Sequence, residues 1–105
     1  MPISIQSVAV TTSESIATTA NKLSITVAAT ATSISAANAN RKGFNIENKT
    51  GQTIFVGTAN TVSASNYWFS IPDGTFYEMP RPIYTGAIFG IVASGTAAPQ
   101  ITEFV

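Results

Sequence analysis

Apolar and polar residues alternate along most of this chain, and this period of two most restricts what it can fold into. The clearest examples are Ile3-x-Ile5, Val8-x-Val10 and Leu23-x-Ile25-x-Val27. Successive side chains of a β-strand point to opposite faces, so such alternation indicates strands with one buried face. The polar stretch from Thr12 to Asn21 has no apolar face repeating every three or four residues, so we expect a loop or an irregular strand there. No helix is needed to explain the pattern.

Turn signals divide the remainder into short strands. Lys49-Thr50-Gly51-Gln52 and Pro72-Asp73-Gly74 read as turns of two hairpins, and the apolar run 87–93 is expected as a central strand because both of its faces are apolar. Residues 28–40 are expected as a flat strand with a weakly specified register. Roughly six strands after residue 42 and two to three before it predict an all-β fold, either an antiparallel sandwich or a jelly-roll-like small barrel. The six later strands are expected at 44–46, 53–57, 67–71, 75–79, 87–93 and 100–105.

The composition changes near residue 40. The first forty residues contain no aromatic residue, no glycine and only two charges, Glu14 and Lys22, whereas all ten aromatic residues lie between Phe44 and Phe104. Ordering forty residues costs on the order of 40 to 80 kcal/mol of backbone entropy, and the few large apolar side chains available there return less than this. We therefore predict an extended N-terminal arm over 1–40, partly β and forming an interface, followed by a compact β domain over 41–105. A disordered linker is the alternative interpretation of the arm.

The charge content restricts the partners. Charged residues make up 10% of the chain and the net charge is zero, against about 25% in typical soluble proteins, so much of the surface is expected to face other protein. Five scattered basic residues do not provide the basic footprint that nucleic acid requires. The pair Arg41-Lys42 is interpreted as solvated. No apolar run approaches the length of a membrane-spanning helix, and the N-terminus lacks the features of a signal peptide, so we expect a soluble chain made in the cytoplasm.

No catalytic, metal-binding or cofactor-binding residues stand out. The chain has no cysteine and no histidine, which excludes disulfides, the usual zinc ligands and triads that need either residue. Asp73 is expected to bond backbone within its turn, and Glu47 and Glu103 to face solvent or pair with Lys49 or Arg41. Calcium would require a denser cluster of oxygen ligands. The sequence therefore predicts a protein that is not an enzyme.

Aromatic residues supply the candidate recognition surface. Tyr67-Trp68-Phe69, together with Tyr77 and Tyr84, could stack on sugar rings or anchor a protein interface, although core packing with one ring facing an interface is the favoured interpretation. The apolar residues of the arm are the other candidates for contact with a partner. The predicted interface residues are Ile3, Ile5, Val8, Val10, Leu23, Ile25, Val27, Tyr67, Trp68 and Tyr84.

Residues 40–105 resemble a short β module that recurs in virion proteins of tailed bacteriophages. The resemblance rests on the segments Asn40–Thr50, Ile54–Gly57, Ile71–Gly74 with Tyr77–Met79, Tyr84–Thr96 and Ile101–Phe104, which follow one another in the same order. It implies a virion structural role, and the chain length suggests a capsid cement or decoration protein. Such proteins commonly form trimers where capsomers meet, with arms that reach the major capsid protein. The resemblance covers scaffold positions and implies no active residues.

Two alternatives remain open. A tail, neck or fibre-attachment component would occupy the same virion setting. A carbohydrate-binding module that uses Tyr67, Trp68 and Tyr77 belongs to another class, and an enzyme is the last possibility. A cement protein should raise the melting temperature of expanded shells, whereas a sugar-binding module should lose glycan retention when Trp68 is removed.

Overall fold

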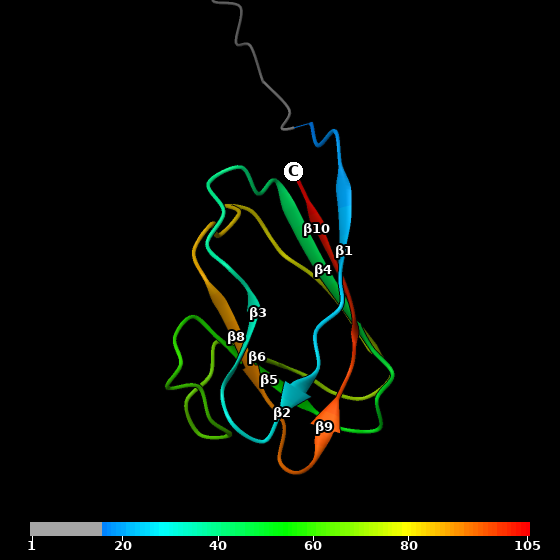
Figure 1. Cartoon of the computed structure of the whole chain (residues 1–105), viewed down its shortest axis with the longest axis vertical. Helices are drawn as coiled ribbons and strands as arrows, with labels where there is room; N and C mark the ends of the chain where they lie inside the picture. The colour runs from blue at the N-terminus through cyan, green and yellow to red at the C-terminus, as the bar shows by residue number, and fades with distance from the viewer. Residues whose placement is uncertain (1–15) are drawn as a thin grey trace, which may run out of the picture.

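The computed structural model describes residues 16–105, which form β-strands joined by turns and loops, without a helix (Figure 1). Every paired strand in this part of the chain is antiparallel to its neighbour. The predicted all-β class is therefore confirmed. The strands are β1 (Ala20–Leu23), β2 (Val27–Ala28), β3 (Thr32–Ser35), β4 (Gly43–Asn48), β5 (Ile54–Gly57), β6 (Phe69–Ile71), β7 (Thr75–Glu78), β8 (Ile88–Ile91), β9 (Thr96–Ala97) and β10 (Gln100–Phe104).

Two four-stranded sheets enclose the core. One sheet has the order β1-β10-β4-β7 and the other β3-β8-β5-β6, while β2 and β9 form a short pair at one end of the domain (Figure 1). The run 87–93 was expected in the centre of a sheet, and β8 indeed lies between β3 and β5. In β4 the alternation is complete, since Phe44, Ile46 and Asn48 are buried and the residues between them are partly exposed. The apolar core is contributed by both sheets and by β2 and β9: Val27, Ile34, Phe44, Ile46, Ile54, Val56, Ile71, Met79, Ile88, Val92, Ala97 and Ile101.

The two predicted hairpins are wrong. β4 pairs with β10 and β7, whereas β5 pairs with β6 and β8, so the turn at 49–53 carries the chain from one sheet to the other. The turn at 72–74 does the same between β6 and β7. Both turns contain a glycine with a positive φ, 84° at Gly51 and 81° at Gly74, which only glycine adopts readily. Turn residues reveal that the chain reverses there, but they do not reveal which strand will be the partner.

Buried Asn48 holds the two sheet-crossing turns together. Its side-chain amide donates hydrogen bonds of 2.7 Å to the backbone carbonyls of Gln52 and Ile71, and its carbonyl oxygen accepts one from the Thr50 hydroxyl at 2.7 Å. The side chain is fully buried, and its amide hydrogen bonds link the two turns. The sequence alone does not distinguish a buried asparagine from an asparagine exposed in a turn.

The expected boundary near residue 40 is not a boundary of the fold. β1 pairs with β10 and β3 pairs with β8, so strands on both sides of residue 40 share the same sheets. Val27 and Ile34 are fully buried in the core, which corrects the prediction that Val27 contacts a partner. β3 packs closely because Gly90 on β8 leaves space for the Ile34 side chain. The candidate residues Ile3, Ile5, Val8 and Val10 lie outside the described residues.

Candidate functional site

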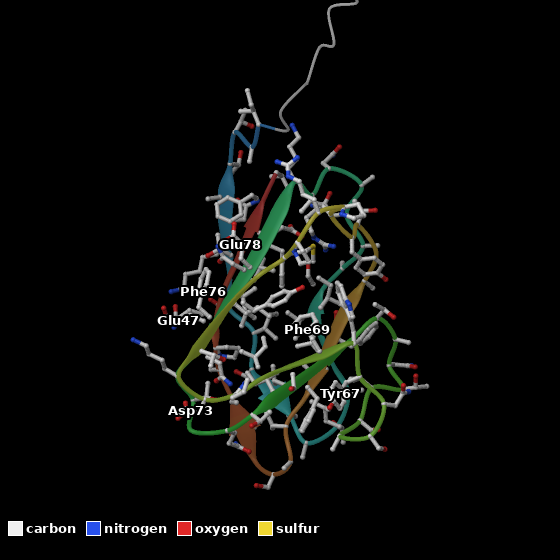
Figure 2. All side chains as sticks on the ribbon, turned by 180° about the vertical axis from the view of Figure 1, so that it is seen from behind. Glu47, Tyr67, Phe69, Asp73, Phe76 and Glu78 are labelled. Atoms are coloured by element: carbon white, nitrogen blue, oxygen red, sulfur yellow. The ribbon has the colours of Figure 1, made fainter. Side chains whose placement is uncertain are left out.

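The carboxylates of the described residues do not converge on a catalytic or metal site. Glu47 on β4 and Glu78 on β7 lie on the outer face of their sheet, with Phe76 between them, and Asp73 occupies the β6–β7 turn (Figure 2). The Asp73 carboxylate accepts a hydrogen bond of 2.8 Å from the Gly51 backbone N–H, so it links the two sheet-crossing turns. Residues 16–105 contain no group of three or more histidine, cysteine, aspartate or glutamate side chains placed to hold a metal ion.

Arg41 and Glu103 form a buried ion pair, with Arg41 Nε at 2.8 Å from Glu103 Oε2. Arg41 is only 3% exposed, which corrects the prediction that it is solvated, while Glu103 takes the Arg41 partner that was one of its expected alternatives. Lys49 lies 3.7 Å from the Glu47 carboxylate in an exposed pair, which was also one of the expected alternatives. The Arg41 guanidinium donates its remaining hydrogen bonds to the Ser35 hydroxyl and to the backbone carbonyls of Ala36, Tyr84 and Gly86.

The hydrogen bonds around Glu103 determine its protonation. Burial by itself raises the pKa of this carboxyl group, but hydrogen bonds from Arg41, Ser35 and Asn38 and the positive charge of Arg41 outweigh burial and lower the pKa. The carboxylate is therefore charged and fully partnered. These hydrogen bonds tie the end of β3 and the 84–86 loop to β10.

Three of the predicted interface residues line a single hollow. Tyr67, Trp68 and Tyr84 surround a depression of about 360 Å³ together with the loop that joins β5 to β6. Tyr67 and Trp68 are 47% and 43% exposed, so much of each ring is open to solvent. Tyr84 follows Trp68 by sixteen residues, and no local sequence pattern indicated that the fold would bring these side chains together.

Tyr77 is not part of this hollow. Its ring stacks on Phe69 with 3.9 Å between ring centroids and an interplanar angle of 16°, and its burial raises the pKa of its hydroxyl. The stack joins β6 of one sheet to β7 of the other. Tyr77 therefore contributes to packing. The sequence had suggested it as a sugar-stacking ring beside Tyr67 and Trp68, but the third aromatic residue of the hollow is Tyr84.

A second depression, again of about 360 Å³, lies between the outer strands β1 and β3. Leu23 and Ile25, two of the predicted interface residues, are partly exposed there and pack on the edge of the core. Small residues complete its walls on the β3 side. We call this depression the β1/β3 groove; its lining residues are Leu23, Ile25, Ser33, Ile34, Ser35, Ala36, Ala37, Asn38 and Glu103.

Phe76 is an exposed aromatic residue that the sequence did not mark as a candidate. It is 57% exposed on the outer face of β7, opposite Glu47 of β4. The alternation offered a signal, because a buried-side Tyr77 requires its neighbour Phe76 to face outward. Figure 2 shows Phe76 with Glu47 and Glu78 along one flank of the domain, away from Tyr67.

The described residues contain no helix that is long and apolar enough to span a membrane. Comparison with protein-family models, with curated proteins and with solved structures found no match to this chain.

Proposed function

We propose that this chain is a structural protein of a tailed-bacteriophage virion, of the capsid cement or decoration kind. It attaches to the mature head through protein–protein contacts and performs no chemistry. Its partners are the major capsid protein and further copies of the chain, a trimer being favoured, and it is located in the virion after synthesis in the host cytoplasm. The resemblance of residues 40–105 to virion β modules and the low charge of the chain support this proposal.

The observation that carries the proposal is the β1/β3 groove. Both bordering strands are outer strands, so within residues 16–105 each has one edge that no other strand pairs with. Proteins protect such edges with charged residues, proline, short strands or bulges; β3 (Thr-Ser-Ile-Ser) has no charge and no proline, although it is short and its pairing with β8 shifts register between Ser33 and Ser35. Leu23 and Ile25 add partly exposed apolar surface beside that edge. A neighbouring chain could therefore add a strand along β3 and cover these side chains.

Such an attachment explains how a small protein would stabilise a shell. A site assembled from several capsid subunits is complete only in the expanded head, so the protein binds that state and not dissociated subunits. Binding to one state stabilises it by mass action, in proportion to the logarithm of ligand concentration over Kd. No active residue is required for this function.

Two matched serine substitutions test the proposal. Ser33 on β3 and Ser70 on β6 are both exposed and lie on the two opposite outer strands of the same sheet, but only Ser33 lines the groove. We expect the wild-type chain and Ser70→Lys to cosediment with expanded heads stripped of accessory proteins and to raise their melting temperature. Ser33→Lys places a charge at the open edge and should lose most of this effect.

Thermal unfolding of each free variant controls for damage to the fold, because exposed substitutions of this kind change stability by about 0.5 kcal/mol or less. Equal head binding by both lysine variants would show that the groove is not the attachment surface. Absence of binding by the wild-type chain would contradict the cement function itself.

A further inference from the structure

We infer that the hollow lined by Tyr67, Trp68 and Tyr84 binds a neutral saccharide. The hollow shares no lining residue with the β1/β3 groove, so this inference is independent of the attachment surface proposed above. It is lined mainly by the loop between β5 and β6, a loop that lies at the lower left of Figure 1.

The walls combine aromatic rings with unused polar groups. Within residues 16–105, the Tyr67 hydroxyl, the Trp68 indole N–H and the hydroxyls of Thr58 and Thr61 form no hydrogen bond to protein, whereas the Tyr84 hydroxyl packs against Gly86. A pyranose ring has an apolar face of C–H groups and a rim of hydroxyls. It can therefore stack on an exposed ring while its rim pairs with such donors and acceptors.

The rings are held in place before any ligand arrives. Trp68 contacts Tyr84 edge to face, with centroids 5.6 Å apart and planes at 71°, and Tyr67 leans on Phe55 at 5.1 Å. The backbone N–H of Trp68 also bonds the Val56 carbonyl at 2.7 Å, which fixes its position beside β5. Rigid aromatic side chains lose little conformational entropy on binding, so this arrangement favours affinity.

The loop opposite the rings is likewise fixed. Val62 is buried, and its side chain packs over Gly57, where a Cβ atom would lie 2.9 Å from it. Backbone hydrogen bonds join Ser63 and Asn66 in both directions, at 2.8 and 3.2 Å, and the Asn66 amide donates to the Thr61 carbonyl at 3.3 Å. The hollow therefore keeps its shape without a ligand.

The absence of charge selects among ligands. None of the nine residues lining the hollow is charged. Nucleotides and single-stranded nucleic acid also stack on aromatic rings, but they need basic side chains for their phosphates. A purely apolar ligand would leave the hydroxyls of the wall unpaired. A volume of about 360 Å³ is at the small end of ligand pockets, which suits a short saccharide better than a peptide segment.

The test exploits the fact that Trp68 is the only tryptophan of the chain. Its fluorescence is followed while the full-length protein is titrated with lactose, maltotriose, cellotriose and diacetylchitobiose, each to roughly millimolar concentration. We expect a saturable change in emission with at least one of them. Because the hollow has no basic side chain, a carboxylate on the sugar should not increase affinity, and 3′-sialyllactose should bind no more tightly than lactose.

Variants assign the binding to the hollow. Tyr67→Ala and Tyr84→Ala keep Trp68 as the reporter and should weaken binding about tenfold or more, the loss expected when a stacking ring is removed. Phe76→Ala removes an equally exposed ring from the other sheet and should leave binding unchanged. Tyr67→Phe keeps the ring and separates stacking from hydroxyl bonding, and circular dichroism verifies the fold of each variant.

Several results would overturn the inference: no emission change with any of the four neutral sugars, tighter binding of the sialylated sugar, or an equal loss in Phe76→Ala. If Tyr67→Ala changed head binding or self-association and sugar binding were absent, the hollow would be a protein interface instead.

Discussion

Arg41 uses all five N–H donors of its guanidinium inside the fold. Nε bonds Glu103, and the two terminal nitrogens each form two further hydrogen bonds. Lysine has a single point of charge and cannot reproduce this fork. Removing one partner of a buried ion pair leaves the other charge unpaired, which costs more than the pair itself contributes.

We predict that Arg41→Met lowers the free energy of unfolding by about 3 to 5 kcal/mol, and that Arg41→Lys restores only part of it. Urea denaturation monitored by circular dichroism measures both. Lys49→Met is the matched control, since Lys49 is 74% exposed in its pair with Glu47 and should change stability by about 0.5 kcal/mol or less. A loss in Arg41→Met no greater than in the control would show that the cluster is dispensable.

Glu103 predicts how stability depends on pH. Its folded-state pKa lies below the ordinary value of 4.5, because the hydrogen bonds and the charge of Arg41 outweigh its burial. The stabilisation is therefore complete above the ordinary value and is lost as the pH falls through the folded-state value. We expect Glu103→Gln, less stable at neutral pH, to show a weaker fall in stability between about pH 5 and pH 3 than the wild type. Parallel curves of stability against pH for the two proteins would refute this role.

At the scale of elements, the contact between β3 and β8 depends on one glycine. A Cβ atom at Gly90 would lie 2.5 Å from Ile34 Cδ1, so the Ile34 side chain occupies the space that an alanine would need. We predict that Gly90→Ala destabilises the domain by about 1 to 3 kcal/mol through overpacking. Ile34→Val removes the clashing methyl group, at a cost of about 0.5 to 1.5 kcal/mol.

The double variant distinguishes this contact from general damage to the sheet. Because the smaller valine relieves the clash, Gly90→Ala with Ile34→Val should lose less stability than the sum of the two single changes, by about 0.5 kcal/mol or more. Strict additivity of the three measured unfolding free energies would mean that the Ile34 methyl group is not what excludes a Cβ from Gly90.

These elements also show what sequence reasoning could reach. Period-two alternation located β4, β5 and β10 correctly, and a run that is apolar on both faces located β8, because burial shapes the residue pattern of each strand separately. The residue pattern did not indicate which strands pair, and both expected hairpins in fact cross between sheets. The polar strand β3 is joined to the core by the contact of Ile34 with Gly90. The sequence indicated only part of the hollow: Tyr67 and Trp68 are adjacent in sequence, whereas only the fold brings Tyr84 next to them.

Across the whole molecule, strands distant in sequence are paired. β1 lies beside β10, and β4 lies between β10 and β7, so the two ends of the described chain meet in one sheet. The composition break near residue 40 therefore does not separate an arm from a domain within the described residues. It separates a segment rich in small polar residues, which supplies outer strands β1 and β3, from the aromatic segment that supplies most of the core.

This arrangement gives the proposed attachment its location. The uncharged outer edge of β3 belongs to the segment rich in small polar residues, while the hollow with Trp68 lies in the aromatic segment. One molecule would then present two separate surfaces, a groove for neighbouring protein chains and a hollow for a saccharide. Each can be removed without the other, since the two share no lining residue.

If the proposal is correct, a phage encodes this chain, and cryo-electron microscopy of that phage's purified virions tests the virion role most directly. We predict density for the two-sheet domain on the outside of the head, repeated where capsomers meet, with the β1/β3 groove covered by a strand from a neighbouring chain. Virions that lack the chain, or that carry it only on the tail, would contradict its role as a capsid cement protein.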